Sequence, residues 1–182
     1  VLANLDLVTE DRVERIEGEA RFIRATVYFD LLRLYAKTWS DGDPGENLGV
    51  PLVTDPTTVE NVNTKVPRST VAAVYDQVLT DLIDAETLLP EQNGFFATTY
   101  AASAILSRVY LAQGDYSAAA EAASRVIESG LYELTRSYAD AFNKGSQEGG
   151  NATPEDVYAI QINSKFGVND MNTFFASSPV AE

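Results

Sequence analysis

Hydrophobic residues recur every three or four positions from residue 13 onward, a spacing that predicts an α-helix with apolar faces. Two neighbouring stripes share this first segment, so we expect the helix to be covered on two sides. Thr9 is expected to cap its N terminus, and the turn-forming residues 40–45 place its end near Trp39. The first stripe comprises Val13, Ile16, Ala20, Ile23, Val27, Leu31 and Leu34. The second stripe comprises Phe22, Ala25, Phe29, Leu32, Ala36 and Trp39.

A second helix is predicted between Ser69, a residue type that caps helix N termini, and Pro90, which cannot continue a helix. Residues 40–69, which lie between the two helices, are expected to form a loop insertion, because this segment is polar and contains turn residues and prolines. The inner stripe of the second helix comprises Val71, Val74, Val78, Leu82, Ala85 and Leu88. Its acidic residues are expected to lie on a solvated face, and they are Asp81, Asp84 and Glu86.

Residues 100–130 carry the most specific pattern of the chain. A third helix is predicted to begin after Thr98 or Thr99 and to end at Gly114 in the left-handed conformation. Asp115 is expected to cap a fourth helix, which is rich in alanine and ends at Gly130. Fixed offsets typical of one tetratricopeptide-type helical hairpin relate Leu106, Tyr110, Gly114, Tyr116, Ala119, Ala123 and Val126.

The C-terminal part is less regular. A brief helix is predicted over residues 138–142, and the alternation of residues 157–162 predicts a short strand. The rest of residues 144–182 is expected to be irregular and rich in loops. The predicted fold is therefore mostly α, with tetratricopeptide-like helical hairpins, long loop insertions and a minor short strand. We expect residues 1–182 to be a single helical region of a larger protein, since the chain opens without an initiator methionine.

The composition narrows the possible functions. The chain contains no cysteine and no histidine, so a thiolate nucleophile, a Ser-His triad, a zinc finger and a His-ligated metal are all excluded. Its net charge of -14 makes nucleic acid an unfavourable partner, because phosphates would be repelled. No stretch approaches the roughly 18 apolar residues that a membrane-spanning helix needs. We expect no catalytic residue, no metal site and no cofactor.

Several short segments follow one another in a specific order over residues 10–162. They are EARFIRA at 19–25, YFDL at 28–31, GVPLV at 49–53, RSTV at 68–71, VYDQV at 74–78, AETLLP at 85–90, GDY at 114–116 and EDVYAI at 155–160. This series resembles the SusD/RagB family of outer-membrane nutrient-binding lipoproteins, and the strength of the resemblance lies in the ordered combination.

The resemblance implies a protein built on tetratricopeptide-like repeats that binds an oligosaccharide or another nutrient at the cell surface of Bacteroidota-type bacteria. It implies delivery of that ligand to a TonB-dependent, SusC-like transporter of the outer membrane, against which the repeat helices pack. Family members are anchored by an N-terminal lipidated cysteine, which this sequence lacks, and the family's large C-terminal ligand-binding portion is also missing. Membrane attachment would therefore need an anchor outside this chain.

Aromatic and amide side chains are the candidate ligand-binding groups, because an aromatic face can stack on the apolar face of a sugar ring while amides bond its hydroxyls. Trp39 is the single tryptophan, and its alternative role is to close the second stripe of the first helix. The C-terminal candidates are Phe174 and Phe175 with Asn169 and Asn172 nearby, and their alternative role is packing against residues absent from this chain.

An acidic turn offers hard oxygen ligands, but its spacing departs from the EF-hand pattern. A solvated turn is the favoured interpretation of Asp41, Asp43, Glu46 and Asn47. The preferred function is that of a binding protein. A tetratricopeptide-type scaffold that docks peptides is the alternative, but its inner face would be expected to carry basic and amide groups, and the third helix offers only Arg108. An enzyme would need a carboxylate pair in a cleft, which nothing in the sequence places.

Overall fold

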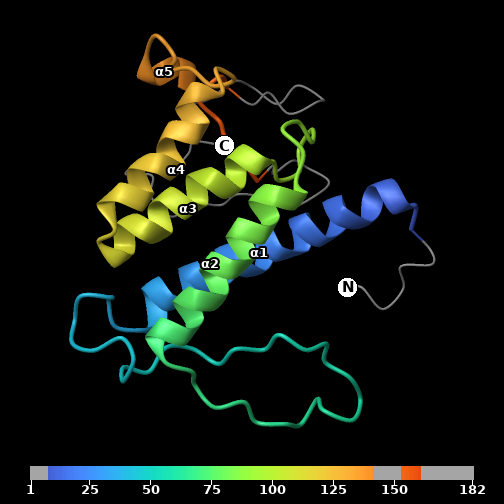
Figure 1. The fold of residues 1–182 in the computed structure, drawn as a ribbon, viewed down its shortest axis with the longest axis vertical. Helices are drawn as coiled ribbons and strands as arrows, with labels where there is room; N and C mark the ends of the chain where they lie inside the picture. The colour runs from blue at the N-terminus through green and yellow to red at the C-terminus, as the bar shows by residue number, and fades with distance from the viewer. Residues whose placement is uncertain (1–7, 142–152, 161–182) are drawn as a thin grey trace, which may run out of the picture.

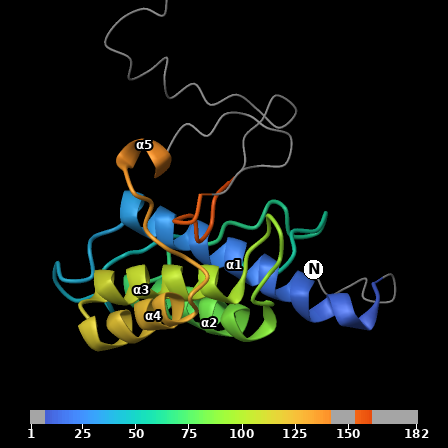
Figure 2. The same cartoon turned by 90° about the horizontal axis from the view of Figure 1, so that it is seen from above.

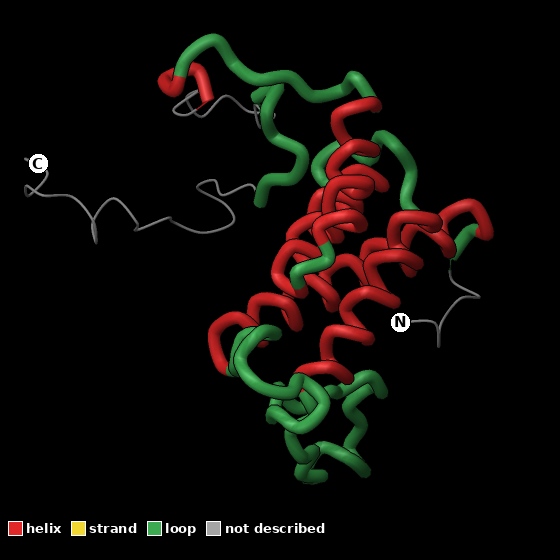
Figure 3. Tube along the Cα trace, turned by 60° about the vertical axis from the view of Figure 1, so that its left-hand side comes forward, coloured by secondary structure: helices red, strands yellow, loops and turns green. Residues whose placement is uncertain are grey.

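The computed structural model describes residues 8–141 and 153–160, and within them the chain is built from helices and loops (Figures 1 and 3). This confirms the mostly helical fold. The helices in chain order are α1 (Glu10–Tyr35), α2 (Val71–Leu88), α3 (Thr99–Gln113), α4 (Tyr116–Glu128) and the short α5 (Tyr138–Ala141). None of the described helices is long and apolar enough to cross a membrane.

Consecutive helices pack side by side, α1 against α2, α2 against α3, and α3 against α4 (Figures 1 and 2). Their facing sides share one hydrophobic cluster, because each helix turns an apolar stripe toward its neighbour. Its fully buried large side chains include Phe22 of α1, Val74, Val78 and Leu82 of α2, and Leu106 and Val109 of α3.

Helix α1 is buried on one face and not on two. The second predicted stripe is buried at Phe22, Phe29 and Leu32, whereas Ile23 and Leu34 of the first stripe are 56% and 74% exposed. The expectation of two covered sides is therefore wrong for the described structure, because the fully buried hydrophobic residues of α1 all belong to the second stripe. The first stripe remains an apolar band on the surface.

The end of α1 also differs from the prediction. The helix stops at Tyr35 rather than near Trp39, and Ala36 already has extended backbone with φ -122° and ψ 168°. The carbonyl of Tyr35 accepts a hydrogen bond of 3.1 Å from the Arg68 guanidinium, a partner 33 residues away that no local pattern reveals. At the other end, Thr9 occupies the N-cap position, but its side chain makes no capping hydrogen bond.

The insertion at 40–69 is fastened both to itself and to α1. Arg68 donates to the Gly49 carbonyl at 2.6 Å and to the Tyr35 carbonyl of α1 at 3.1 Å, and the phenol of Tyr28 of α1 accepts from the Val53 amide at 2.7 Å. Ser69 pairs through its backbone with residues 49 and 50 and lies one residue before the N-cap of α2. The cap is Thr70, whose hydroxyl accepts from the Ala73 amide, and the prediction of Ser69 is wrong by one residue.

The helical hairpin of α3 and α4 is confirmed as predicted. Thr98 caps α3, and Gly114 ends it at φ 81°, a left-handed backbone that would cost an alanine about 1 kcal/mol or more. The Asp115 carboxylate accepts from the Ala118 amide at 3.0 Å and caps α4. Ala122 is fully buried against α3, as the alanine-rich pattern predicts, and Gly130 follows the end of α4 with φ 66°.

Two carboxylates of α2 join helices rather than facing water. Asp81 is 0% exposed and accepts two hydrogen bonds from Arg24, at 2.6 and 2.7 Å, and one from Arg21 at 3.2 Å. Glu86 accepts from Ser103 of α3 and from Arg125 of α4, the latter at 2.7 Å. The expectation of a solvated face is therefore wrong for both residues. Donors from α1 reach Asp81, and donors from α3 and α4 reach Glu86. Hydrogen bonding to Asp81 raises the pKa of Arg24.

Asp84, the third acidic residue of that set, is partly exposed and lies 2.9 Å from a guanidinium nitrogen of Arg21.

The C-terminal described segment is not a strand. Residues 157–160 do not form a strand with any other described segment, so the predicted strand is wrong there. Residues 161 and 162 lie outside the described part. Tyr158 instead packs edge-on against Phe22 of α1, with ring centroids 4.9 Å apart. Glu155 accepts two hydrogen bonds of 2.6 Å from the hydroxyl and amide of Thr135, which lower its pKa. The short helix α5 agrees with the prediction over Tyr138–Ala141.

Candidate ligand-binding site

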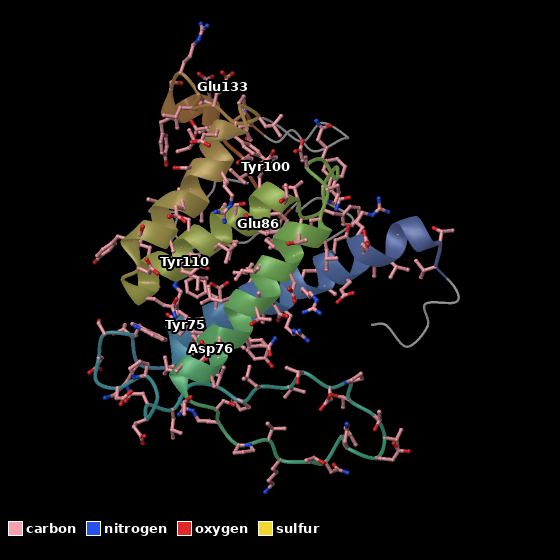
Figure 4. The ribbon with its side chains drawn as sticks, viewed as in Figure 1. Tyr75, Asp76, Glu86, Tyr100, Tyr110 and Glu133 are labelled. Carbon is pink, nitrogen blue, oxygen red and sulfur yellow. The ribbon has the colours of Figure 1, made fainter. Side chains whose placement is uncertain are left out.

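Trp39, the first candidate from the sequence, lies in the turn after α1 and packs against the hydrophobic cluster. Its indole stands edge-on to the Tyr75 ring of α2, with centroids 5.1 Å apart at 78° (Tyr75 is labelled in Figure 4). This packing matches the alternative role, in which Trp39 extends the core. Its binding role stays a prediction, since no ligand is present. The other candidates, Asn169, Asn172, Phe174 and Phe175, lie outside the described residues.

The acidic turn is held by its own hydrogen bonds. Asp43 accepts from the Gly45 amide at 2.8 Å, and the Asn47 side chain donates to the Asp41 carbonyl at 2.7 Å. Residues 8–141 and 153–160 contain no group of three or more His, Cys, Asp or Glu side chains that could hold a metal ion. This turn gives no reason to place a ligand there.

A hollow of about 420 Å³ lies between the first half of α1 and the connection from α2 to α3. It is within the size range of small-molecule sites. Figure 1 shows that connection rising beside the N-terminal half of α1. Its lining combines an aromatic ring, two amides, charged groups and an aliphatic side chain, which are Phe96, Gln92, Asn93, Arg12, Arg15, Glu19 and Ile16, together with Gly94.

The connection that forms one wall of the hollow is rigidly anchored. Pro90 stops α2, and its carbonyl accepts from the Thr99 amide at 3.1 Å, which closes the loop at its base. The Asn93 amide donates to the Ala97 carbonyl and to the Glu19 carboxylate of α1, both at 2.8 Å. The loop is therefore fixed both to itself and to α1.

Anchoring at Asn93 leaves the phenylalanines of the loop in the solvent. Phe95 and Phe96 are 56% and 63% exposed, and Phe96 borders the hollow. An exposed aromatic face beside amides suits a hydroxyl-rich ligand, because the ring stacks at little entropic cost. The Gln92 amide can both donate and accept, and the Asn93 amide, whose N–H groups are already bonded, can accept. This arrangement can bind a sugar, and it contains no nucleophile activated by a base.

A second hollow, of about 470 Å³, lies at the other end of α1 between Leu31, Tyr35, Val50 and Pro51. Its polar group is Arg68, whose guanidinium already donates to the carbonyls of Tyr35, Leu48 and Gly49. It therefore offers few free polar groups for orienting a ligand. The hollow beside Phe96 is the better candidate site.

The sequence analysis named no candidate residue between the second and third helices and so missed this site. Two adjacent phenylalanines next to Gln92 and Asn93 in a short loop were the available signal, since large aromatic residues in a loop are either buried or functional. Their approach to Arg12 and Arg15 depends on contacts across more than 70 residues, which no local pattern shows.

Comparison with known proteins decides the family. The family model described as starch-binding, associating with the outer membrane, and named SusD-like, matches residues 1–111, more than half of the chain. The chain belongs to the SusD-like family. This confirms the resemblance drawn from the ordered segments, and the family's description connects it with carbohydrate binding and the outer membrane.

Individual SusD-like proteins support the same assignment. The starch-binding protein SusD of Bacteroides thetaiotaomicron is 29% identical over 166 residues, which cover 85% of this chain and 26% of that protein. A crystal structure of a SusD superfamily protein from the same species has a TM-score of 0.74 and 33% identity, and the match covers 87% of this chain and 34% of that one.

A laminarin-binding SusD-like protein has a TM-score of 0.56 and 27% identity, with 70% of this chain and 27% of that chain covered. The chain thus spans about a quarter of the length of the curated relatives that it matches.

Proposed function

We propose that this protein captures a glycan or a related nutrient at the cell surface and delivers it to a TonB-dependent, SusC-like transporter of the outer membrane. Capture would proceed by shape, stacking and hydrogen bonding, and no bond would be broken. Membership of a family described as starch-binding supports this proposal, as does the structural likeness to a laminarin-binding protein. The observation that carries it on this chain is the hollow, where an exposed ring stands beside two amides.

A peptide-binding tetratricopeptide scaffold is the other candidate. Such a scaffold needs an accessible inner face that carries polar clamps. In the described structure the corresponding face of α3 is closed, because Ala102, Leu106 and Val109 are buried between the neighbouring helices. This closure favours the glycan-binding function.

The binding function predicts that Phe96→Ala weakens binding of an oligosaccharide about tenfold, because loss of a stacking aromatic face costs on the order of 1–1.5 kcal/mol. Isothermal titration of the purified protein against a panel of oligosaccharides is the measurement. Tyr116→Ala is the matched control, since Tyr116 is an exposed aromatic residue at the start of α4 and does not line the hollow, so its loss should leave the affinity unchanged. Flat isotherms with every glycan of the panel would contradict the proposal.

Delivery to a transporter makes a separate prediction. When outer membranes are solubilised in mild detergent, a tagged form of the protein should retain a TonB-dependent transporter in about equimolar amount, identified by mass spectrometry. Recovery of the tagged protein without any such transporter would remove the delivery step and leave the binding function standing.

A further inference from the structure

Two guanidinium groups line the hollow beside Phe96. Arg12 and Arg15 are three residues apart on α1, so their side chains project from one side of the helix. The chain as a whole carries 27 acidic and 13 basic residues, and most of its surface would repel an anion. The two arginines therefore place positive charge at the hollow, whereas the net charge of the whole chain is negative.

Neither arginine forms a close ion pair with a carboxylate of the described residues. Arg12 forms no ion pair with another described side chain. Arg15 lies 3.9 Å from Glu19, which is at the outer limit for an ion pair, and its side chain is 41% exposed. By contrast, Arg21 and Arg24 on the same helix are held at 2.6–3.2 Å by carboxylates of Glu17 and the buried Asp81.

Glu19, the acidic group of the hollow, is oriented by the loop. Its Oε1 accepts the Asn93 amide at 2.8 Å, and its side chain is only 23% exposed. The Glu19 carboxylate therefore fastens the loop to α1. The planar guanidinium groups of Arg12 and Arg15 have N–H donors available for a ligand. Such forks match carboxylate and sulfate oxygens in geometry and charge.

We propose that the hollow takes a sugar that carries a negatively charged group, either a carboxylate or a sulfate ester. This inference rests on the proposed glycan-binding function and specifies its substrate class. Arg12 and Arg15 hold the charged group, and Phe96 covers the apolar face of the ring. The Gln92 amide donates to and accepts from the sugar hydroxyls, while Asn93, whose two N–H groups are taken by Glu19 and Ala97, accepts through its side-chain oxygen.

The test compares three oligosaccharides of equal length by isothermal titration with the purified protein: a neutral glucan, an oligomer of a hexuronic acid and a sulfated oligomer. At least one anionic oligomer is expected to bind ten times or more tightly than the neutral one, because hydrogen bonds to a charged group are the stronger ones. Which anionic oligomer binds more tightly identifies the charged group.

The double variant Arg12→Gln, Arg15→Gln should abolish the preference, so that the anionic and neutral oligomers bind this variant with equal affinity. Arg108→Gln, an exposed arginine of α3, is the control for loss of a positive charge and should change neither affinity. An unchanged urea midpoint for the double variant would show that folding is retained, as the exposure of both side chains leads us to expect.

The two proposals fail differently. Equal affinity for all three oligosaccharides, or anionic binding that survives the double variant, would overturn this inference and leave glycan binding in place. Absence of binding to all three and to the wider panel would overturn the proposed function together with it.

Discussion

Replacing Asp81 by alanine is expected to lower the free energy of unfolding by about 3–4 kcal/mol. Removing one partner of a buried ion pair costs about 3–5 kcal/mol, and we expect the lower part of that range because the arginine side chains are 27% and 32% exposed. Arg24 would lose both of its hydrogen bonds to Asp81, whereas Arg21 would keep its contacts with Glu17 and Asp84. Urea unfolding followed by circular dichroism measures the change.

The control is Asp76→Ala, which removes an exposed carboxylate from the same helix; Figure 4 labels this residue. It should change the free energy of unfolding by no more than about 0.5 kcal/mol, as is usual for exposed positions. A similarly small effect for Asp81→Ala would mean that the contact between α1 and α2 does not depend on this carboxylate. The double variant Arg24→Ala, Asp81→Ala should be less destabilised than the sum of the two single variants.

Leu106→Ala is expected to destabilise the protein by about 2–5 kcal/mol, the range measured for leucine truncations that leave a cavity in a core. Leu106 is 1% exposed at the middle of α3, the helix that packs against both α2 and α4. Neighbouring side chains cannot collapse into the space without moving two helices. The same urea experiment provides the measurement.

Leu111→Ala is the matched control for this truncation, because Leu111 lies on the same helix but is 58% exposed. Its effect should stay within about 0.5 kcal/mol. If both truncations cost the same, Leu106 would not be part of the buried hydrophobic cluster as described.

Local signals in the sequence were enough to predict the hairpin of α3 and α4. Thr98, Gly114 and Asp115 each act on backbone groups within five residues, so their effects can be worked out without knowing the fold. The same reasoning misplaced the cap of α2, because Ser69 is held by backbone pairing with the distant residues 49 and 50. The capping residue of a helix can thus be predicted from the sequence where no tertiary contact involves the neighbouring residues.

Burial of Asp81 could have been predicted but was not. Its position falls on the inner stripe between Val78 and Leu82, so the helical period alone places it toward α1. Treating it as solvated followed residue type and ignored position. The exposure of Ile23 and Val27 had no such signal, because the periodicity shows that a face is apolar and not what covers it.

The candidate site depended still more on tertiary structure. Its two walls, at residues 12–19 and 92–96, meet because α1 and α2 pack antiparallel and bring the end of α2 beside the first half of α1. The sequence could have offered Phe95 and Phe96 as exposed aromatic residues, but not the arginines across from them. Trp39 remains a prediction for binding, with a packing role that the structure shows.

The central claim is that the hollow between α1 and the connection from α2 to α3 is where this SusD-like protein holds its ligand. A crystal structure of the protein with its tightest-binding oligosaccharide tests this most directly. We expect electron density for a sugar ring against Phe96, with hydroxyls bonded to Gln92 or Asn93 and an acidic group at Arg12 and Arg15. Density for the sugar elsewhere on the protein, with this hollow empty, would contradict the account.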